Sequence, residues 1–196
     1  MNDVASELGF VAVFIARNAT EREAWSHDED VLLEDDVDRF ADMPFAIGIG
    51  DNRVRQRVFE RFQERLRFAT LIHPGATFGK GQRPVVESRQ GVVVSAGARF
   101  MNNVQVGDFT VFNLNATVGH DSIVERFAHL TPGVNVSGYV HIGERAWLGT
   151  GSAVNQGKAS KRLVIGADAI IGSGAVVVAD CEPGAVYAGV PARKIR

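Results

Sequence analysis

Apolar residues recur every six positions along the second half of the chain, and this period constrains the fold more than any other feature. The series is unbroken over eleven positions: Val94, Phe100, Val106, Phe112, Val118, Val124, Leu130, Val136, Ile142, Leu148 and Val154. Apolar residues make up 45% of the composition, so eleven successive matches would arise by chance about once in several thousand trials. A second series, four positions after the first, holds only small residues or valine: Ala98, Val104, Thr110, Ala116, Ser122, Ala128, Val134, Val140, Ala146 and Ser152.

A period of six fits neither an α-helix, with about 3.6 residues per turn, nor a strand that alternates between two faces. It fits a short extended segment followed by a turn, repeated along the chain. Three such segments make one triangular coil. We therefore predict a parallel β-helix in which the larger apolar side chains stack inward and the small residues fill the corners. The expected bends, some of them with positive φ, fall at Gly107, Asn113, Asn115, Gly119, Gly143 and Gly149.

The period is interrupted at two places. After Val154 the inward series resumes at Ile165, Ile171 and Val177, with Ala169, Ala175 and Cys181 in the small positions. Five extra residues are therefore expected in a surface loop around Lys158 to Arg162. The segment from Phe78 to Val93 also breaks the period, and we interpret it as an irregular opening coil.

The composition changes near Leu71, which divides the chain into predicted domains at residues 1–70 and 71–196. The first part reads as a small α/β unit, with a buried strand from Phe10 to Ile15 and a second strand from Pro44 to Gly50. Asp51 and Asn52 are placed to cap a helix. Its predicted apolar face holds Val54, Val58, Phe59, Phe62 and Leu66, and its solvated face holds Arg53, Arg57, Glu60, Arg61 and Glu64.

Length, charge and cysteine content exclude several classes of protein. In 196 residues no apolar run is long enough to span a bilayer. The first ten residues lack the basic start and apolar stretch of a secretory signal, so we expect a cytoplasmic location. One cysteine permits no internal disulfide and no multi-cysteine metal site. The 21 basic and 23 acidic residues nearly balance, so the charge of the chain does not indicate binding to nucleic acid. Small molecules and other copies of the chain are therefore the expected partners.

Three segments carry a resemblance to a known family. They are Gly119-His120-Asp121 followed by residues 127–133, the ending at residues 188–195, and residues 46–52 with Arg55 and the Ile72-His73-Pro74 segment. Together with the repeats, they resemble the left-handed β-helix acyltransferases, more narrowly the sialic acid O-acetyltransferase and nucleotide-linked amino-sugar N-acetyltransferase type. The resemblance covers nearly the whole chain.

The resemblance implies an incomplete Rossmann-like α/β domain followed by a left-handed parallel β-helix, assembled as a homotrimer. It also implies transfer of an acetyl group from acetyl-CoA to an amino or hydroxyl group of a sugar or sugar nucleotide, as in the biosynthesis of cell-surface polysaccharides. The family usually begins with a strand and a Gly-rich loop that help to hold the nucleotide, and this chain starts after them. It also has Ile15, Ala16 and Arg17 where acidic residues are expected. Three interpretations of the N-terminal part stay open: a shortened chain, a domain with another ligand, or a support for the trimer.

His120 is the leading catalytic candidate. It lies two positions after the inward Val118, so it should face outward, and a neutral imidazole suits a general base. The resemblance gives it that role, with Asp121 orienting the ring. The resemblance also places His129 beside the thioester end of the donor and Asn113 beside the acceptor. Ordinary surface and turn positions are the alternatives for all four residues.

Three glycines, Gly138, Gly149 and Gly151, would let the pantetheine arm of coenzyme A run close to the backbone. The Gly138 amide is the candidate donor to the thioester carbonyl. Arg193 and Lys194 are candidates for contacts with the coenzyme A phosphates. Cys181 occupies a small inward position, so we interpret it as a buried thiol, which favours direct transfer over an acyl-enzyme.

Two other classes of function remain alternatives. A metal-dependent hydratase could use His120, His129 and His141 as zinc ligands, although the spacing does not match that family and no metal is expected. A non-catalytic β-helix used for assembly is the second alternative. His27 and His73 are interpreted as a loop residue and a turn residue.

Overall fold

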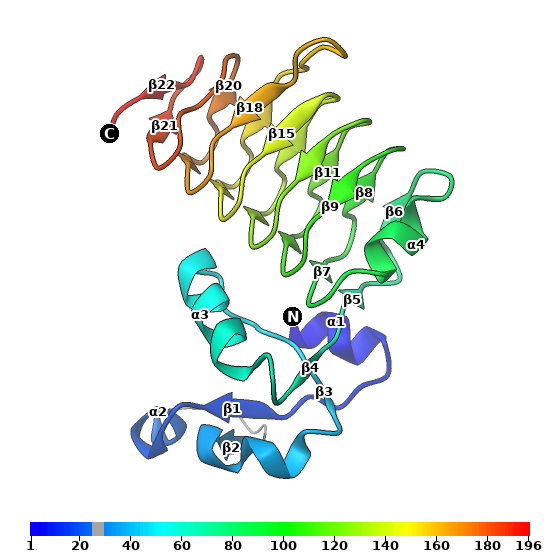
Figure 1. Cartoon of the computed structure of the whole chain (residues 1–196), viewed down its shortest axis with the longest axis vertical. Coiled ribbons are helices and arrows are strands. Elements are labelled where there is room, and N and C mark those ends of the chain that lie inside the picture. The colour runs from blue at the N-terminus through cyan, green and yellow to red at the C-terminus, as the bar shows by residue number, and fades with distance from the viewer. Residues whose placement is uncertain (25–29) are drawn as a thin grey trace.

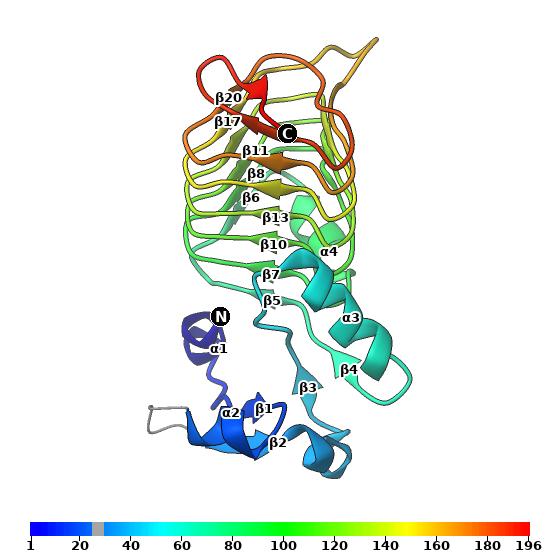
Figure 2. The same ribbon diagram turned by 90° about the vertical axis from the view of Figure 1, so that its left-hand side faces the viewer.

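The computed structural model describes residues 1–24 and 30–196, so His27 lies outside the described residues. From Leu71 onward the chain winds into a prism of very short strands (Figures 1 and 2). Strands one coil apart pair in parallel, as Val111 of one coil does with His129 of the next. One full coil therefore takes eighteen residues, or three of the six-residue repeats.

Three sheets form the sides of the prism. The eight-stranded sheet contains β5 (Leu71–Ile72), β7 (Val93–Val94), β10 (Val111–Phe112), β13 (His129–Leu130), β16 (Trp147–Leu148), β19 (Ile170–Ile171), β21 (Val186–Ala188) and β22 (Arg193–Lys194). The six-stranded sheet contains β6 (Thr77–Phe78), β8 (Arg99–Phe100), β11 (Thr117–Val118), β14 (Asn135–Val136), β17 (Ala153–Val154) and β20 (Val176–Val177). The four-stranded sheet contains β9 (Gln105–Val106), β12 (Ile123–Val124), β15 (Val140–Ile142) and β18 (Leu163–Ile165).

The predicted interior is confirmed. Every member of the inward apolar series and of the small series is buried, including Thr110, Ser122 and Ser152. Cys181 is buried as expected, and burial raises the pKa of its thiol to about 11. Most of the predicted turn glycines are required by close packing between coils and not by positive φ. A β-carbon on Gly119, for example, would overlap the backbone of Ser137 and Gly138 in the next coil.

Each end of the prism is closed by an irregular element. At the start, helix α4 (Gln82–Glu87) replaces a strand of the four-stranded sheet, as the break in the period predicted. The Gln82 side chain donates to the Val104 carbonyl (2.6 Å) and accepts from the Val104 amide (3.0 Å), so it pairs with the sheet edge as a strand would. At the other end β22 turns back antiparallel to β21.

The N-terminal part is a set of short elements below the prism (Figure 1). They are α1 (Asn2–Glu7), β1 (Phe14–Ala16), α2 (Ala19–Glu23), β2 (Val31–Leu33), the 3-10 helix η1 (Glu34–Phe40), β3 (Pro44–Phe45), α3 (Asn52–Phe62) and β4 (Arg67–Phe68). The strands form two separate parallel pairs, β1 with β2 and β3 with β4.

Both predicted N-terminal strands were wrong in detail. The first is shorter than expected and is not buried, since Phe10 is 52% exposed and Val11 is 90% exposed. Its pairing is limited to β2 among the described residues, which leaves much of this segment uncovered. The second strand ends at Phe45. The carbonyls of Ile49 and Gly50, which a longer strand would use in a sheet, accept hydrogen bonds from Arg55 instead.

Helix α3 begins as predicted, with the Asp51 side chain accepting from the Val54 amide (2.8 Å). It lies along one edge of the prism, where the turns run from the four-stranded to the eight-stranded sheet. We call this edge, formed by residues 107–110, 125–128, 143–146 and 166–169, the α3 edge. Arg55, only 1% exposed, donates to the carbonyls of Phe109 (3.0 Å) and Phe127 (2.6 Å) in successive coils. This buried guanidinium therefore holds the N-terminal part against the β-helix.

None of the helices in the described part of the chain is both long and apolar enough to cross a membrane.

Candidate active site

The turns from the six-stranded to the four-stranded sheet stack on a second edge of the prism. We call this edge, formed by residues 101–104, 119–122, 137–139 and 155–162, the His120 edge. Asn103, Asp121 and Tyr139 occupy equivalent positions in three successive coils, and their φ angles of 61°, 58° and 56° are all left-handed. The repeat of one coil therefore brings these side chains together on the same edge.

His120 and Asp121 form an imidazole–carboxylate pair on the His120 edge. The Nδ1 atom of His120 lies 2.8 Å from Oδ2 of Asp121. Oδ1 of Asp121 accepts a hydrogen bond of 3.2 Å from the side-chain Nδ2 of Asn103. These hydrogen bonds, the one from His120 first, hold the pKa of the Asp121 carboxyl below its usual value. Because the carboxylate accepts the Nδ1 proton, the Nε2 lone pair is free to take a proton from a substrate. His120 is 35% exposed, so a substrate can reach it.

The next coil fixes the orientation of His120 from the other side. The Tyr139 amide donates to the His120 carbonyl (2.9 Å), and the two rings meet edge to face at 5.0 Å. Gly138 lies against the imidazole, where a β-carbon would stand 2.6 Å from Nε2. Among the described residues the Gly138 amide makes no backbone hydrogen bond. The ring therefore rests on a buried glycine of the next coil.

Asn113, Gly149 and Gly151 lie on the third edge, where the turns run from the eight-stranded to the six-stranded sheet. We call this edge, formed by residues 113–116, 131–134 and 149–152, the Asn113 edge. Asn113 accepts from the Leu114 amide of its own turn (2.8 Å). Gly151 has a φ of 68° and open space around it. Within one chain these residues therefore lie on a different edge of the prism from His120.

His129 lies on the outer side of the eight-stranded sheet, but it is not on an open surface. It is only 8% exposed, because the segment leading into α3 covers it, and its Nδ1 lies 3.2 Å from the Gly50 carbonyl. Burial lowers the pKa of His129 to about 4. Its Nε2 is buried without a hydrogen-bond partner in the described structure. A neutral imidazole with Nδ1 as the donor is therefore fixed at this position.

The basic candidates at the C-terminal end are exposed. Arg193 and Lys194 lie on β22 at the end of the eight-stranded sheet. Lys194 pairs with Glu182 (2.7 Å), which raises the pKa of the lysine. Neither residue approaches the His120–Asp121 pair in the contacts of one chain.

The sequence prediction missed three residues around the pair: Asn103, Tyr139 and Arg162. The first two could have been found, because they lie eighteen residues before and after Asp121, which is one coil. Arg162 donates from Nε to the Asp121 carbonyl (3.2 Å). It stands one coil after Tyr139 in the strand register, but the five inserted residues before it shift it off the eighteen-residue count.

The three histidines of the zinc hydratase alternative lie on different sides of the prism. His120 is on an edge, His129 is on the eight-stranded sheet, and His141 is on the four-stranded sheet, where it pairs with Glu125 (2.7 Å). Within residues 1–24 and 30–196 no group of three potential metal ligands is found. One chain therefore does not assemble the ligand set which that alternative requires.

A prism of six-residue repeats with an imidazole–carboxylate pair on one edge has the organisation of an acyl-transferring enzyme. No protein-family model matches the chain. It is 31% identical over 153 residues to the GDP-perosamine N-acetyltransferase of Escherichia coli O157:H7, which covers 78% of this chain and 67% of that protein. The crystal structure of PerB from Caulobacter crescentus, in complex with CoA and GDP-perosamine, matches with a TM-score of 0.84 and 28% identity over 100% of this chain and 90% of that one. The acetyltransferase domain of PglB from Neisseria gonorrhoeae, in complex with acetyl coenzyme A, matches with a TM-score of 0.83 and 27% identity over 98% and 91% of the two chains.

The chain therefore belongs to the left-handed β-helix acyltransferases of the type that acts on nucleotide-linked amino sugars. It is an acetyltransferase, and its acyl donor is acetyl-CoA.

Proposed function

We propose that the chain transfers the acetyl group of acetyl-CoA to the amino group of a nucleotide-linked sugar, with His120 as the general base. The observation that carries this proposal is the His120–Asp121 pair, which leaves Nε2 of the imidazole free on an accessible edge. The choice of acceptor is supported by the relatives, since the E. coli protein is a GDP-perosamine N-acetyltransferase and PerB is in complex with GDP-perosamine.

The residues on the His120 edge account for the movement of one proton. Acetyl-CoA supplies an acetyl group activated as a thioester. As the acceptor nitrogen attacks the carbonyl carbon, Nε2 of His120 takes the proton that the nitrogen loses. Asp121 stabilises the imidazolium that forms, because its carboxylate already accepts the Nδ1 proton at 2.8 Å. The imidazolium can then return the proton to the leaving sulfur, so His120 ends in its starting form.

The Gly138 amide is the proposed donor to the developing oxyanion. It lies against the imidazole and makes no backbone hydrogen bond in the described chain, as a donor reserved for a ligand should. The buried thiol of Cys181, with its raised pKa, supports direct transfer rather than an acyl-enzyme. His129 is proposed to contact the thioester end of the donor through its unpartnered Nε2.

We propose that the active unit is a homotrimer, in which the His120 edge of one chain faces the Asn113 edge of a neighbour. This arrangement would bring together the site residues that one chain holds apart. The outer face of the eight-stranded sheet supports it, because its ladder positions on either side of the covered His129 are apolar: Val111, Trp147, Ile170 and Val186. The equivalent ladder of the six-stranded sheet is more polar and holds Thr77, Arg99, Thr117, Asn135, Ala153 and Val176. An apolar face of this kind favours contact with another copy.

The incomplete Rossmann-like part, residues 1–70, is proposed to hold the nucleotide end of the acceptor, and the reaction is proposed to occur in the cytoplasm. The rigid attachment of this part supports the first proposal. Arg55 spans two coils of the prism, and Asn52 donates to the Arg145 carbonyl in a third (2.8 Å). A bound nucleotide would therefore sit at a fixed distance from the His120 edge.

The test is turnover on a small panel of acceptors. The purified protein is given acetyl-CoA with GDP-perosamine, the same amino sugar without its nucleotide, or a nucleotide sugar that has only hydroxyl groups. Free thiol and the mass of the product are measured. We expect thiol release and an acetylated product with the nucleotide-linked amino sugar. Acetylation of the hydroxyl sugar alone would contradict transfer to nitrogen, and equal turnover of the free amino sugar would contradict recognition of the nucleotide.

A further inference from the structure

The inserted loop of residues 155–162 is attached to the coil that supports His120. At its start the Gly157 amide donates to the Gly138 carbonyl (3.0 Å), and at its end the Leu163 amide donates to the Tyr139 carbonyl (3.1 Å). Between these points Lys158 and Lys161 close a small hairpin through two backbone hydrogen bonds of 2.9 and 3.0 Å. The loop projects beyond the outline of the other coils (Figure 2). Its base is therefore fixed although its tip extends outward.

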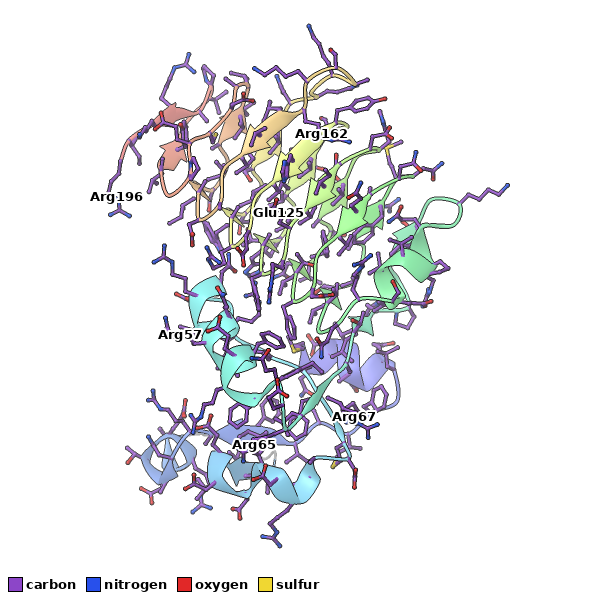
Figure 3. The ribbon with its side chains drawn as sticks, in the orientation of Figure 1. Arg57, Arg65, Arg67, Glu125, Arg162 and Arg196 are labelled. Carbon is purple, nitrogen blue, oxygen red and sulfur yellow. The ribbon has the colours of Figure 1, made fainter. Side chains whose placement is uncertain are left out.

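Arg162 reaches from the base of this loop to the catalytic pair. The backbone of Arg162 lies one coil after Tyr139. Its side chain extends past the coil of Tyr139, and its Nε donates to the Asp121 carbonyl at 3.2 Å. The side chain is half-buried against the prism, and Figure 3 labels it. The strand register pairs Val140 with Leu163, so Arg162 stands where the inserted loop ends, one coil after Tyr139 and at the equivalent position.

This contact completes the set of hydrogen bonds around Asp121. The Asp121 amide donates to the Asn102 carbonyl (3.1 Å), Oδ2 binds His120 (2.8 Å) and Oδ1 binds Asn103 (3.2 Å). The carbonyl is the remaining polar group, and Arg162 holds it. The bond from Arg162 therefore ties the turn that carries His120 and Asp121 to the base of the inserted loop.

We propose that Arg162 is a positioning residue for the transfer reaction, acting through Asp121 on His120; this inference rests on the proposed function of that pair. The guanidinium holds the peptide after Asp121 and so limits movement of the turn from which the His120 and Asp121 side chains project. Catalytic geometry is sensitive to such support, since a displacement of about 1 Å can cost about a hundredfold in rate. Arg162 touches no reacting atom, so its loss should lower kcat and leave the binding of both substrates nearly unchanged.

The experiment compares Arg162→Met with Arg162→Lys and with Lys158→Met, which removes the same charge from the same loop without a contact to Asp121. We expect Arg162→Met to lower kcat roughly tenfold, with each KM within about twofold of the wild-type value. Arg162→Lys should recover most of the loss, because an ammonium can donate to the same carbonyl. Lys158→Met should keep the wild-type kcat. Thermal unfolding of each variant checks that the fold is retained.

A double-mutant cycle decides whether Arg162 acts through the carboxylate. Asp121→Gly removes the carboxylate and tolerates the left-handed backbone. In that background Arg162→Met should cost no more than about twofold, whereas a full tenfold loss in both backgrounds would overturn the inference. A raised KM for acetyl-CoA at unchanged kcat, or an unchanged kcat in Arg162→Met, would also overturn it. If His120→Ala abolishes turnover while Arg162→Met is neutral, only this inference fails; if His120→Ala keeps turnover, the proposed function fails as well.

Discussion

A β-carbon on Gly138 would stand 2.6 Å from Nε2 of His120, so the backbone of one coil sets the position of the imidazole on the coil before it. Gly138→Ala should therefore displace the imidazole and lower kcat by about a hundredfold or more. Its effect on the thermal midpoint should be small, because the histidine is partly exposed and can move. Gly174→Ala is the matched control for general damage, since open space surrounds Gly174, although its positive φ adds some strain. Wild-type kcat in Gly138→Ala would show that the imidazole does not act from this position.

His120→Ala should lower kcat by about two to four orders of magnitude and leave the affinity for acetyl-CoA nearly intact, because its proposed task is removal of the acceptor proton. Asp121→Asn should have a milder effect, since it keeps a polar partner for the ring and loses only the charge. Turnover and acetyl-CoA binding by calorimetry, measured on both variants, check the assignment. A His120→Ala protein with near-wild-type turnover would make His129 the leading candidate for the base.

Burial of His129 makes folding sensitive to acid. Its pKa falls from an ordinary 6.5 to about 4 in the folded chain, so the unfolded chain binds the proton more strongly. The stabilising contribution is therefore present above pH 6.5 and is lost as the pH falls towards 4. Between pH 7 and pH 4.5 the loss should amount to about 2.5 kcal/mol of the free energy of unfolding. Denaturant unfolding at a fixed protein concentration measures it, and His129→Leu should remove this share of the pH dependence. The same pH dependence in His129→Leu and wild type would contradict the assignment.

Arg55 should be the strongest single link between the N-terminal part and the β-helix. Arg55→Met keeps most of the side-chain volume but leaves the carbonyls of Phe109 and Phe127 without their donor. We expect a loss of about 3 kcal/mol in the free energy of unfolding, because buried acceptors remain unpaired. Arg57→Met on the exposed side of α3 is the control and should change stability by less than about 0.5 kcal/mol. Equal stability of the two variants would show that other contacts, such as the packing of the Phe59 ring on Phe109 at 4.4 Å, hold the two parts together.

The interior of the prism could be predicted because a single rule repeats. Each inward residue meets its equivalents one coil above and below, so the period in the sequence determines burial residue by residue, from Val94 to Val177. The same rule extends to the site, since Asn103 and Tyr139 lie one coil from Asp121. Applied to edges as well as to the core, the eighteen-residue repeat would have found both partners.

The features that were not predicted depend on contacts outside the repeat. The cover over His129 comes from Gly50, which is 79 residues away in the sequence. The second strand stops at Phe45 because Arg55 binds the carbonyls that follow it. Arg162 contacts Asp121 from the position before β18, after an insertion that shifts it off the eighteen-residue count. In each case the six-residue repeat does not carry the contact, since Gly50 and Arg55 lie outside the β-helix and the insertion interrupts the count before Arg162.

The separation of His120 and Asn113 onto different edges leads to a test of the trimer by complementation. If each site combines the His120 edge of one chain with the Asn113 edge of its neighbour, His120→Ala and Asn113→Ala damage different halves of the same site. Each variant alone should have low activity. After the two are unfolded together and refolded in equal amounts, a random mixture should contain about one intact site in four, and activity should rise to about a quarter of the wild-type value. Light scattering verifies the trimer before the assay. If the mixture is no more active than the separate variants, the site lies within one chain, and the proposed pairing of the two edges is wrong.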